Sequence, residues 1–132
     1  MSQENLGVIR RGYEALNRLD IEAWLEAFHT DVESHDVAGV LDAPVRGGHA
    51  DLREWVAMMT DTWVDGRYEP LEFREQGEFV MVKVRAVARG SRGGVPVGVV
   101  MFQVFEMRAG KVQRLFSYWH RAEALKAVGL AE

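Results

Sequence analysis

The sequence contains no cysteine, and no apolar run in it approaches the roughly 20 residues that a membrane-spanning helix needs. Without cysteine there is no disulfide framework, no thiolate zinc site and no thiol nucleophile. Basic residues are in the minority, since 16 Lys and Arg stand against 20 Asp and Glu. The resulting charge argues against nucleic acid or an anionic membrane as the main partner, because both attract basic surfaces. The first residues lack the apolar core of a secretory signal, so we expect a cytoplasmic protein.

The histidines do not form a metal-binding pattern. The sequence has four, and His29, His35, His49 and His120 lack metal-ligand spacing such as the paired histidines of a metalloprotease helix. No nucleophile elbow is present either, so a serine-based triad has no support. We therefore expect neither a metal nor another cofactor.

The first half of the chain has the apolar spacing of amphipathic helices. Leu6, Ile9, Tyr13 and Leu16 share one face of a first helix, which places Tyr13 on the buried stripe. Asp20 is a suitable N-cap for a short second helix. These two helices are expected to pack their apolar sides against the rest of one domain.

The second helix is predicted to carry Trp24 and Phe28 on its apolar side. A glycine-bearing loop over 38–48 follows a brief strand, and whether that loop acts as a lid stays open. Apolar residues at helical spacing then mark a third helix, namely Leu52, Trp55, Val56, Met59 and Trp63.

The second half of the chain alternates apolar and polar residues, as strands do. Including the brief early strand, the predicted strands cover 31–37, 68–75, 78–89, 97–107 and 111–120. A last helix over 121–128 ends at Gly129. Helices followed by an antiparallel meander are the pattern of an α+β fold, so we predict one such domain over 1–132.

Both faces of the strand at 97–107 are largely apolar. One face carries Met101, Gln103 and Phe105, and the other carries Phe102 and Val104. The helices can cover one face, and a symmetric partner is the simplest cover for the other, because monomers seldom expose that much apolar sheet. The sequence therefore predicts a homodimer.

The order of these elements resembles the SnoaL-like and ketosteroid-isomerase-like branches of the nuclear transport factor 2-like superfamily. The segments DIEAWLEAFHTDV and YWHRAEALKAVGL carry the resemblance together with the spacing between helices and strands. It implies a curved antiparallel sheet forming a cone-shaped half-barrel closed by N-terminal helices. Members include isomerases, cyclases, dehydratases, epoxide hydrolases and non-catalytic modules, so the function must be argued from the site.

The resemblance to ketosteroid isomerases implies roles for four residues. Tyr13 matches their oxyanion-hole tyrosine and Asp36 their general base, while Gln103 stands where they have a protonated aspartic acid. His120 follows Trp119 where SnoaL-like relatives often carry an aspartate, and it could shuttle a proton. Each residue also has an ordinary structural interpretation, namely core packing for Tyr13, loop capping for Asp36, and hydrogen bonds within the protein for Gln103 and His120.

The residue types suit proton transfer next to a carbonyl, which needs a base on one side and hydrogen-bond donors at the developing oxyanion. Asp36 shares its strand face with Val32 and Ser34, and an apolar surround disfavours a charged carboxylate. Gln103 lies on an apolar face, where an amide without a partner would cost roughly 1–3 kcal/mol. The implied ligand is a small apolar molecule such as a carbonyl compound.

The pocket wall is expected to consist of large apolar side chains that suit a flat ligand. The predicted wall residues are Trp24, Phe28, Met58, Trp63, Met101, Phe105 and Tyr118.

All seven aspartates lie at or before Asp65, so the later strands have none. By resemblance, this argues against the epoxide hydrolases and the polyketide cyclases of the superfamily, which use aspartates on those strands. Three interpretations remain: an enzyme that moves a proton next to a carbonyl, a protein that binds a hydrophobic ligand without turnover, and a dimerisation or association module.

Overall fold

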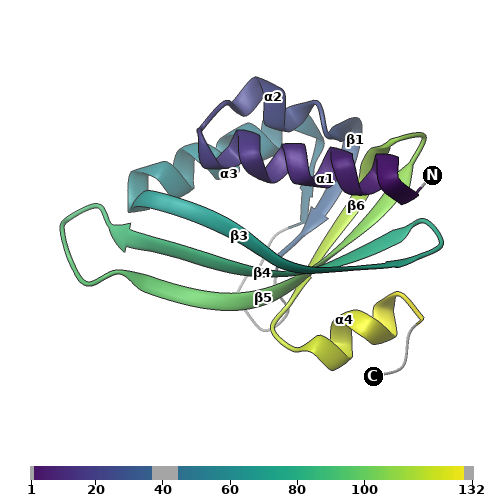
Figure 1. The fold of residues 1–132 in the computed structure, drawn as a ribbon. Helices are drawn as coiled ribbons and strands as arrows, with labels where there is room; N and C mark the ends of the chain where they lie inside the picture. The colour runs from purple at the N-terminus through teal and green to yellow at the C-terminus, as the bar shows by residue number, and fades with distance from the viewer. Residues whose placement is uncertain (1, 37–44, 130–132) are drawn as a thin grey trace.

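The computed structural model describes residues 2–36 and 45–129. It is an α+β fold in which a curved, six-stranded sheet has helices α1, α2 and α3 on one face and α4 on the other (Figure 1). Most of the loop predicted over 38–48, and Val37 at the end of the predicted early strand, lie outside the described residues. The helices are α1 Ser2–Asn17, α2 Ile21–Leu25, α3 Gly48–Thr62 and α4 Arg121–Ala127.

The strands lie in the order β2-β1-β6-β5-β4-β3. Their bounds are β1 Phe28–His35, β2 Val45–Gly47, β3 Trp63–Gln76, β4 Phe79–Gly90, β5 Val97–Arg108 and β6 Lys111–Tyr118. Strands β3 to β6 form the predicted antiparallel meander, and β1 pairs parallel with β6. Gly77 and Gly110 adopt positive φ angles of 60° and 80° in two of the turns, which glycine does without strain.

The two N-terminal helices begin and pack as their sequences predict. Asp20 caps α2 by accepting a hydrogen bond from the Ala23 amide at 3.2 Å. Ile9 and Tyr13 are buried on one stripe of α1. Phe28 was expected on α2 and Trp63 on α3, but each instead begins the strand that follows, because each helix ends before it.

Strand β5 separates two apolar clusters. On its inner face Phe105 and Met107 pack with the core under α1, α2 and α3. On its outer face Phe102 and Val104 pack with Leu125 of α4. This confirms the predicted alternation, and α4 covers part of the outer face.

The other end of β5 is open. Val97, Val99 and Val100 are 51%, 43% and 41% exposed. The predicted homodimer therefore stays a prediction. In the described part of the chain, no helix is long and apolar enough to cross a bilayer.

Candidate functional site

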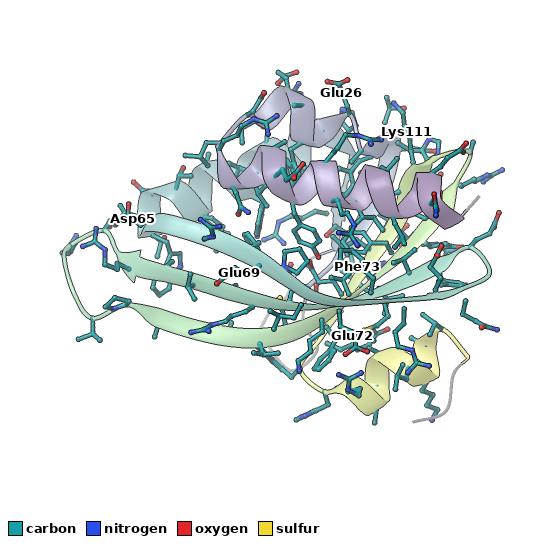
Figure 2. The ribbon with its side chains drawn as sticks, viewed as in Figure 1. Glu26, Asp65, Glu69, Glu72, Phe73 and Lys111 are labelled. Atoms are coloured by element: carbon teal, nitrogen blue, oxygen red, sulfur yellow. The ribbon has the colours of Figure 1, made fainter. Side chains whose placement is uncertain are left out.

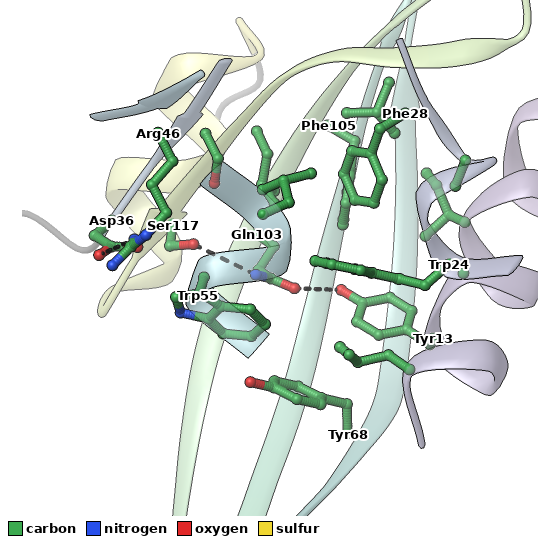
Figure 3. A pocket seen from close by; sticks show the side chains of 18 of the residues that line it. Tyr13, Trp24, Phe28, Asp36, Arg46, Trp55, Tyr68, Gln103, Phe105 and Ser117 are labelled. Carbon is green, nitrogen blue, oxygen red and sulfur yellow. Dashed lines mark hydrogen bonds and ion pairs between the residues drawn. The ribbon is translucent and has the colours of Figure 1, made fainter. Parts of the chain in front are cut away.

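A cavity of about 250 Å³ lies between the N-terminal helices and the inner face of the sheet (Figure 3). Its wall is largely apolar and aromatic. Trp24 packs edge-on against Phe28, with ring centroids 5.2 Å apart, and lies 5.9 Å from the ring of Trp55. The other apolar or aromatic wall residues are Ile9, Gly12, Tyr13, Leu16, Ala27, Leu52, Met59, Tyr68, Met101, Phe105, Val112 and Leu115.

A row of polar side chains crosses this cavity from helix α1 to strand β6. The Tyr13 hydroxyl donates to Gln103 Oε1 at 2.5 Å, and Gln103 Nε2 donates to Ser117 Oγ at 3.4 Å. Gln103 and Ser117 are directly opposite each other on the paired strands β5 and β6. Figure 3 shows the three side chains in line. The amide of Gln103 thus has the partner that its apolar strand face requires.

Two tyrosines of the cavity are unusually hard to ionise. Burial, and then the neighbouring Tyr68, raise the pKa of Tyr13 well above its usual value. Burial, and then the negative charge of Asp36, raise the pKa of Tyr68 to about 12. Both phenols therefore stay protonated and able to donate hydrogen bonds at any physiological pH.

Asp36 also lines the cavity, where it forms an ion pair with Arg46. Arg46 Nη1 donates to Asp36 Oδ2 at 2.5 Å, and their side chains are 14% and 32% exposed. Strand pairing brings these two side chains together, because Arg46 of β2 pairs with Ser34 of β1 and Asp36 directly follows β1. The expected apolar surround of Asp36 is therefore corrected: a cation lies beside the carboxylate.

Tyr68 is held in the cavity wall by its backbone. The Asn17 side chain donates to the Tyr68 carbonyl at 2.9 Å and accepts from the Tyr68 amide at 2.7 Å. Strand β3 is at an edge of the sheet, so these backbone groups face no further strand. Asn17 thus replaces a neighbouring strand at this position and fixes where the Tyr68 ring lies.

The family of this chain follows from a comparison with known families. The SnoaL-like domain matches residues 9–115. The chain belongs to the SnoaL-like domain family. None of the curated proteins matches it.

Solved structures similar to this SnoaL-like chain share the nuclear transport factor 2-like fold. TerC, co-crystallised with polyporic acid, is 26% identical with a TM-score of 0.81, covering 95% of this chain and 97% of TerC. An NTF2-like protein of unknown function from Burkholderia pseudomallei is 21% identical with a TM-score of 0.80, covering 95% and 97%. A putative polyketide cyclase from Xanthomonas campestris is 20% identical with a TM-score of 0.77, covering 96% and 97%.

The structure brings most of the predicted site residues into one cavity. Tyr13, Asp36 and Gln103 all line it. The predicted wall residues Trp24, Phe28, Met101 and Phe105 line the same cavity.

Four other predicted residues lie elsewhere, and their placement corrects the sequence analysis. His120 is exposed at the N-cap of α4, because the chain leaves the sheet after Tyr118. Tyr118 packs with the outer cluster under α4. Met58 is 51% exposed, since α3 turns Leu52, Trp55 and Met59 toward the cavity instead. Trp63 lines a second hollow, which is described below.

Three polar residues of this SnoaL-like site were not predicted from the sequence. Arg46 lies within the loop predicted over 38–48, and Ser117 and Tyr68 lie in strands whose alternation assigns faces but not neighbours. The face of Ser117 was readable, because it follows Leu115 on the inward side of β6. In the described residues, no group of three or more His, Asp and Glu lies close enough to hold a metal ion.

Proposed function

We propose that this SnoaL-like chain binds a small, flat, largely apolar carbonyl compound and moves a proton next to the carbonyl, with Asp36 as the general base. The observation that carries the proposal is that Asp36, Tyr13 and Gln103 line one apolar cavity. A carboxylate and neutral donors on a shared cavity wall are what enolate formation requires. This is an isomerase-like or cyclase-like role.

The polar row suits an oxyanion. Tyr13 occupies Gln103 Oε1, so the Gln103 amide presents its Nε2 hydrogens to the cavity side. Its bond to Ser117 is long, at 3.4 Å, and a ligand oxygen can compete with it. In the proposed step Asp36 takes a proton from the carbon beside the carbonyl, and the enolate oxygen accepts from Gln103. Return of that proton to another carbon completes an isomerisation.

The names of similar structures are consistent with this ligand class. TerC was co-crystallised with polyporic acid, and another similar structure is named a putative polyketide cyclase. We take polyporic acid as a first test ligand for this chain.

Binding without turnover is the second candidate, and a specific contact favours it. Arg46 Nη1 donates to Asp36 Oδ2 at 2.5 Å, so this oxygen already has a hydrogen-bond partner and must release it before it can accept a proton from a ligand. In this alternative the same cavity holds the ligand, and Arg46 and Asp36 only orient it.

We also propose that the chain is a homodimer. Val100 is 41% exposed on the outer face of β5, beyond the part that α4 covers. Sedimentation velocity tests this, and Val100→Glu is expected to shift the protein toward monomer. A wild-type protein that sediments as a monomer at all concentrations would contradict the proposal. The cytoplasmic location stays a prediction from the sequence.

The catalytic proposal is tested by hydrogen exchange at carbon. The protein is incubated in deuterated buffer with cyclic ketones and β,γ-unsaturated ketones, and loss of α-hydrogen signals is followed by NMR. We expect exchange that falls at least tenfold in Asp36→Asn. Asp31→Asn is the matched control, because Asp31 is exposed on the other side of β1.

Ligand binding is measured separately with polyporic acid, through the fluorescence of the cavity tryptophans. Binding without Asp36-dependent exchange would favour the second candidate. Neither binding nor exchange would leave association with a partner as the remaining interpretation and would contradict the proposed function.

A further inference from the structure

A second, larger hollow adjoins the cavity. It measures about 600 Å³ and lies between the ends of α1 and α3 and the strands β3, β4 and β5. We call it the outer groove, although it lies on the inner face of the sheet, the face that α1 and α3 cover. It is defined by Leu19, Val56, Trp63, Val87, Val97 and Val99. Asp65, labelled in Figure 2 where β3 leaves α3, lies at its rim.

The outer groove exposes apolar side chains that a soluble domain usually buries. Leu19, Val97 and Val99 are 58%, 51% and 43% exposed, and all three line it. Its charged residues are Asp65 and Arg67, and the Asp65 carboxylate is already paired with Arg89. Contiguous exposed apolar surface of this kind marks a binding site.

The outer groove lies directly beside the cavity, and the two share part of their walls. Leu16, Trp55, Met59, Tyr68 and Met101 line both hollows. Only the side chains of these shared residues therefore separate the cavity from the outer groove. Trp55 and Met59 are only partly buried, and Asn17 fixes the Tyr68 backbone on the other side.

The two hollows differ in chemistry. The cavity holds Tyr13, Gln103, Ser117 and the Asp36–Arg46 pair, whereas the outer groove offers hydrocarbon with charges at its rim. We propose that the ligand is elongated: a polar, carbonyl-bearing head lies in the cavity, and an apolar alkyl or aryl tail runs past Trp55 and Tyr68 into the outer groove. The head part of this inference rests on the proposed function.

The inference is tested with one head and a series of tails. The probes are 2-alkylcyclohexane-1,3-diones with straight chains of one to twelve carbons, and dissociation constants are measured by calorimetry. Each methylene placed on apolar surface should tighten binding by roughly threefold to fourfold. We expect that gain to continue along the series and to stop once the groove is filled.

Two neighbouring valines provide the matched variants. Val99 lines the outer groove and Val100 points to the opposite face, and they are 43% and 41% exposed. Val99→Glu should weaken the long-chain probe at least tenfold and leave the methyl probe unchanged. Val100→Glu should change neither, whatever it does to the oligomeric state.

The outcomes separate this inference from the proposed function. Affinity that does not change with chain length would overturn the tail site and leave the head site standing. Long-chain binding that depends on Val99 while the methyl probe does not bind would overturn the head site. If Val99→Glu alters sedimentation but not the chain-length gain, the outer groove is an interface between copies, and the inference is wrong.

Discussion

The Tyr13 hydroxyl donates to Gln103 Oε1 at 2.5 Å, although 90 positions of sequence separate the two residues. The bond joins helix α1 to strand β5 across the cavity. It also orients the Gln103 amide, because an oxygen that accepts from Tyr13 turns the nitrogen toward Ser117. This one hydrogen bond thus stabilises the fold and also sets the orientation of the Gln103 amide in the site.

Removing the Tyr13 hydroxyl should destabilise the fold. Tyr13→Phe leaves a buried amide oxygen without its donor, which costs about 1–3 kcal/mol in the free energy of unfolding. Tyr68→Phe is the matched control, because the Tyr68 hydroxyl has no hydrogen-bond partner among the described residues, and it should cost much less. Urea denaturation of both variants checks this, and equal losses would contradict the assigned bond.

The protein should lose stability in alkali, because Tyr13 and Tyr68 ionise more readily in the unfolded chain than in the folded one. Below pH 10 tyrosine is protonated in both the folded and the unfolded chain, so stability does not depend on it. Above that, the unfolded chain releases its proton first, because Tyr68 keeps its own until about pH 12. The pKa of Tyr68 alone stabilises the unfolded state, relative to the folded state, by roughly 3 kcal/mol across this window, and the raised pKa of Tyr13 acts in the same direction.

Urea unfolding midpoints measured from pH 9 to above pH 11 test this alkaline loss. Tyr68→Phe should flatten the decline, and Tyr13→Phe should flatten it as well after allowing for its lower stability. Tyr118→Phe should change it less, because Tyr118 lies outside the cavity and the rise in its pKa is smaller. A decline that all three variants share would point to other groups.

The Asp36–Arg46 pair should show measurable coupling. Their side chains are 32% and 14% exposed, so water screens the contact only in part. A double-mutant cycle with Asp36→Asn and Arg46→Gln should give about 1 kcal/mol in the free energy of unfolding. The more exposed pair Arg53–Glu22 is the comparison, and its coupling should be close to zero. A coupling energy no larger than that of Arg53–Glu22 would show that the Asp36–Arg46 pair does not stabilise the fold.

Asn17 should govern the position of Tyr68. Asn17→Ala removes both bonds to the Tyr68 backbone and should cost about 1–3 kcal/mol in the free energy of unfolding. Exchange of the Tyr68 amide hydrogen should accelerate, as measured by NMR. Asn17→Asp keeps an acceptor for that amide and should protect it better than alanine does. Equal exchange in the two variants would contradict this role.

Local periodicity in the sequence predicts much of this site. Alternation along β5 places Met101, Gln103 and Phe105 on one face, and the structure puts all three in the cavity wall. The helical stripe of α1 likewise places Tyr13 inside. These predictions succeed because period and burial are properties of a single element.

Contacts between distant elements were not predictable in the same way. Nothing in the local pattern shows that β1 pairs parallel with β6, or that β2 brings Arg46 to Asp36. The helical spacing of α3 places Met59 on the apolar stripe, as the structure confirms, but the assignment of Met58 to the pocket wall is wrong, since neighbouring helical residues are about 100° apart. These features depend on tertiary packing that one segment does not encode.

The parallel pairing of β1 with β6 has a consequence for how the protein is made. Strand β1 cannot pair until β6 has been synthesised, and the Tyr13 hydroxyl cannot bond until Gln103 has been synthesised. Until then, the growing chain displays the apolar stripe of α1 without its cover. Folding should thus be slow and largely post-translational, since distant contacts must close before they stabilise anything. The binding site would be among the last parts of the molecule to exist.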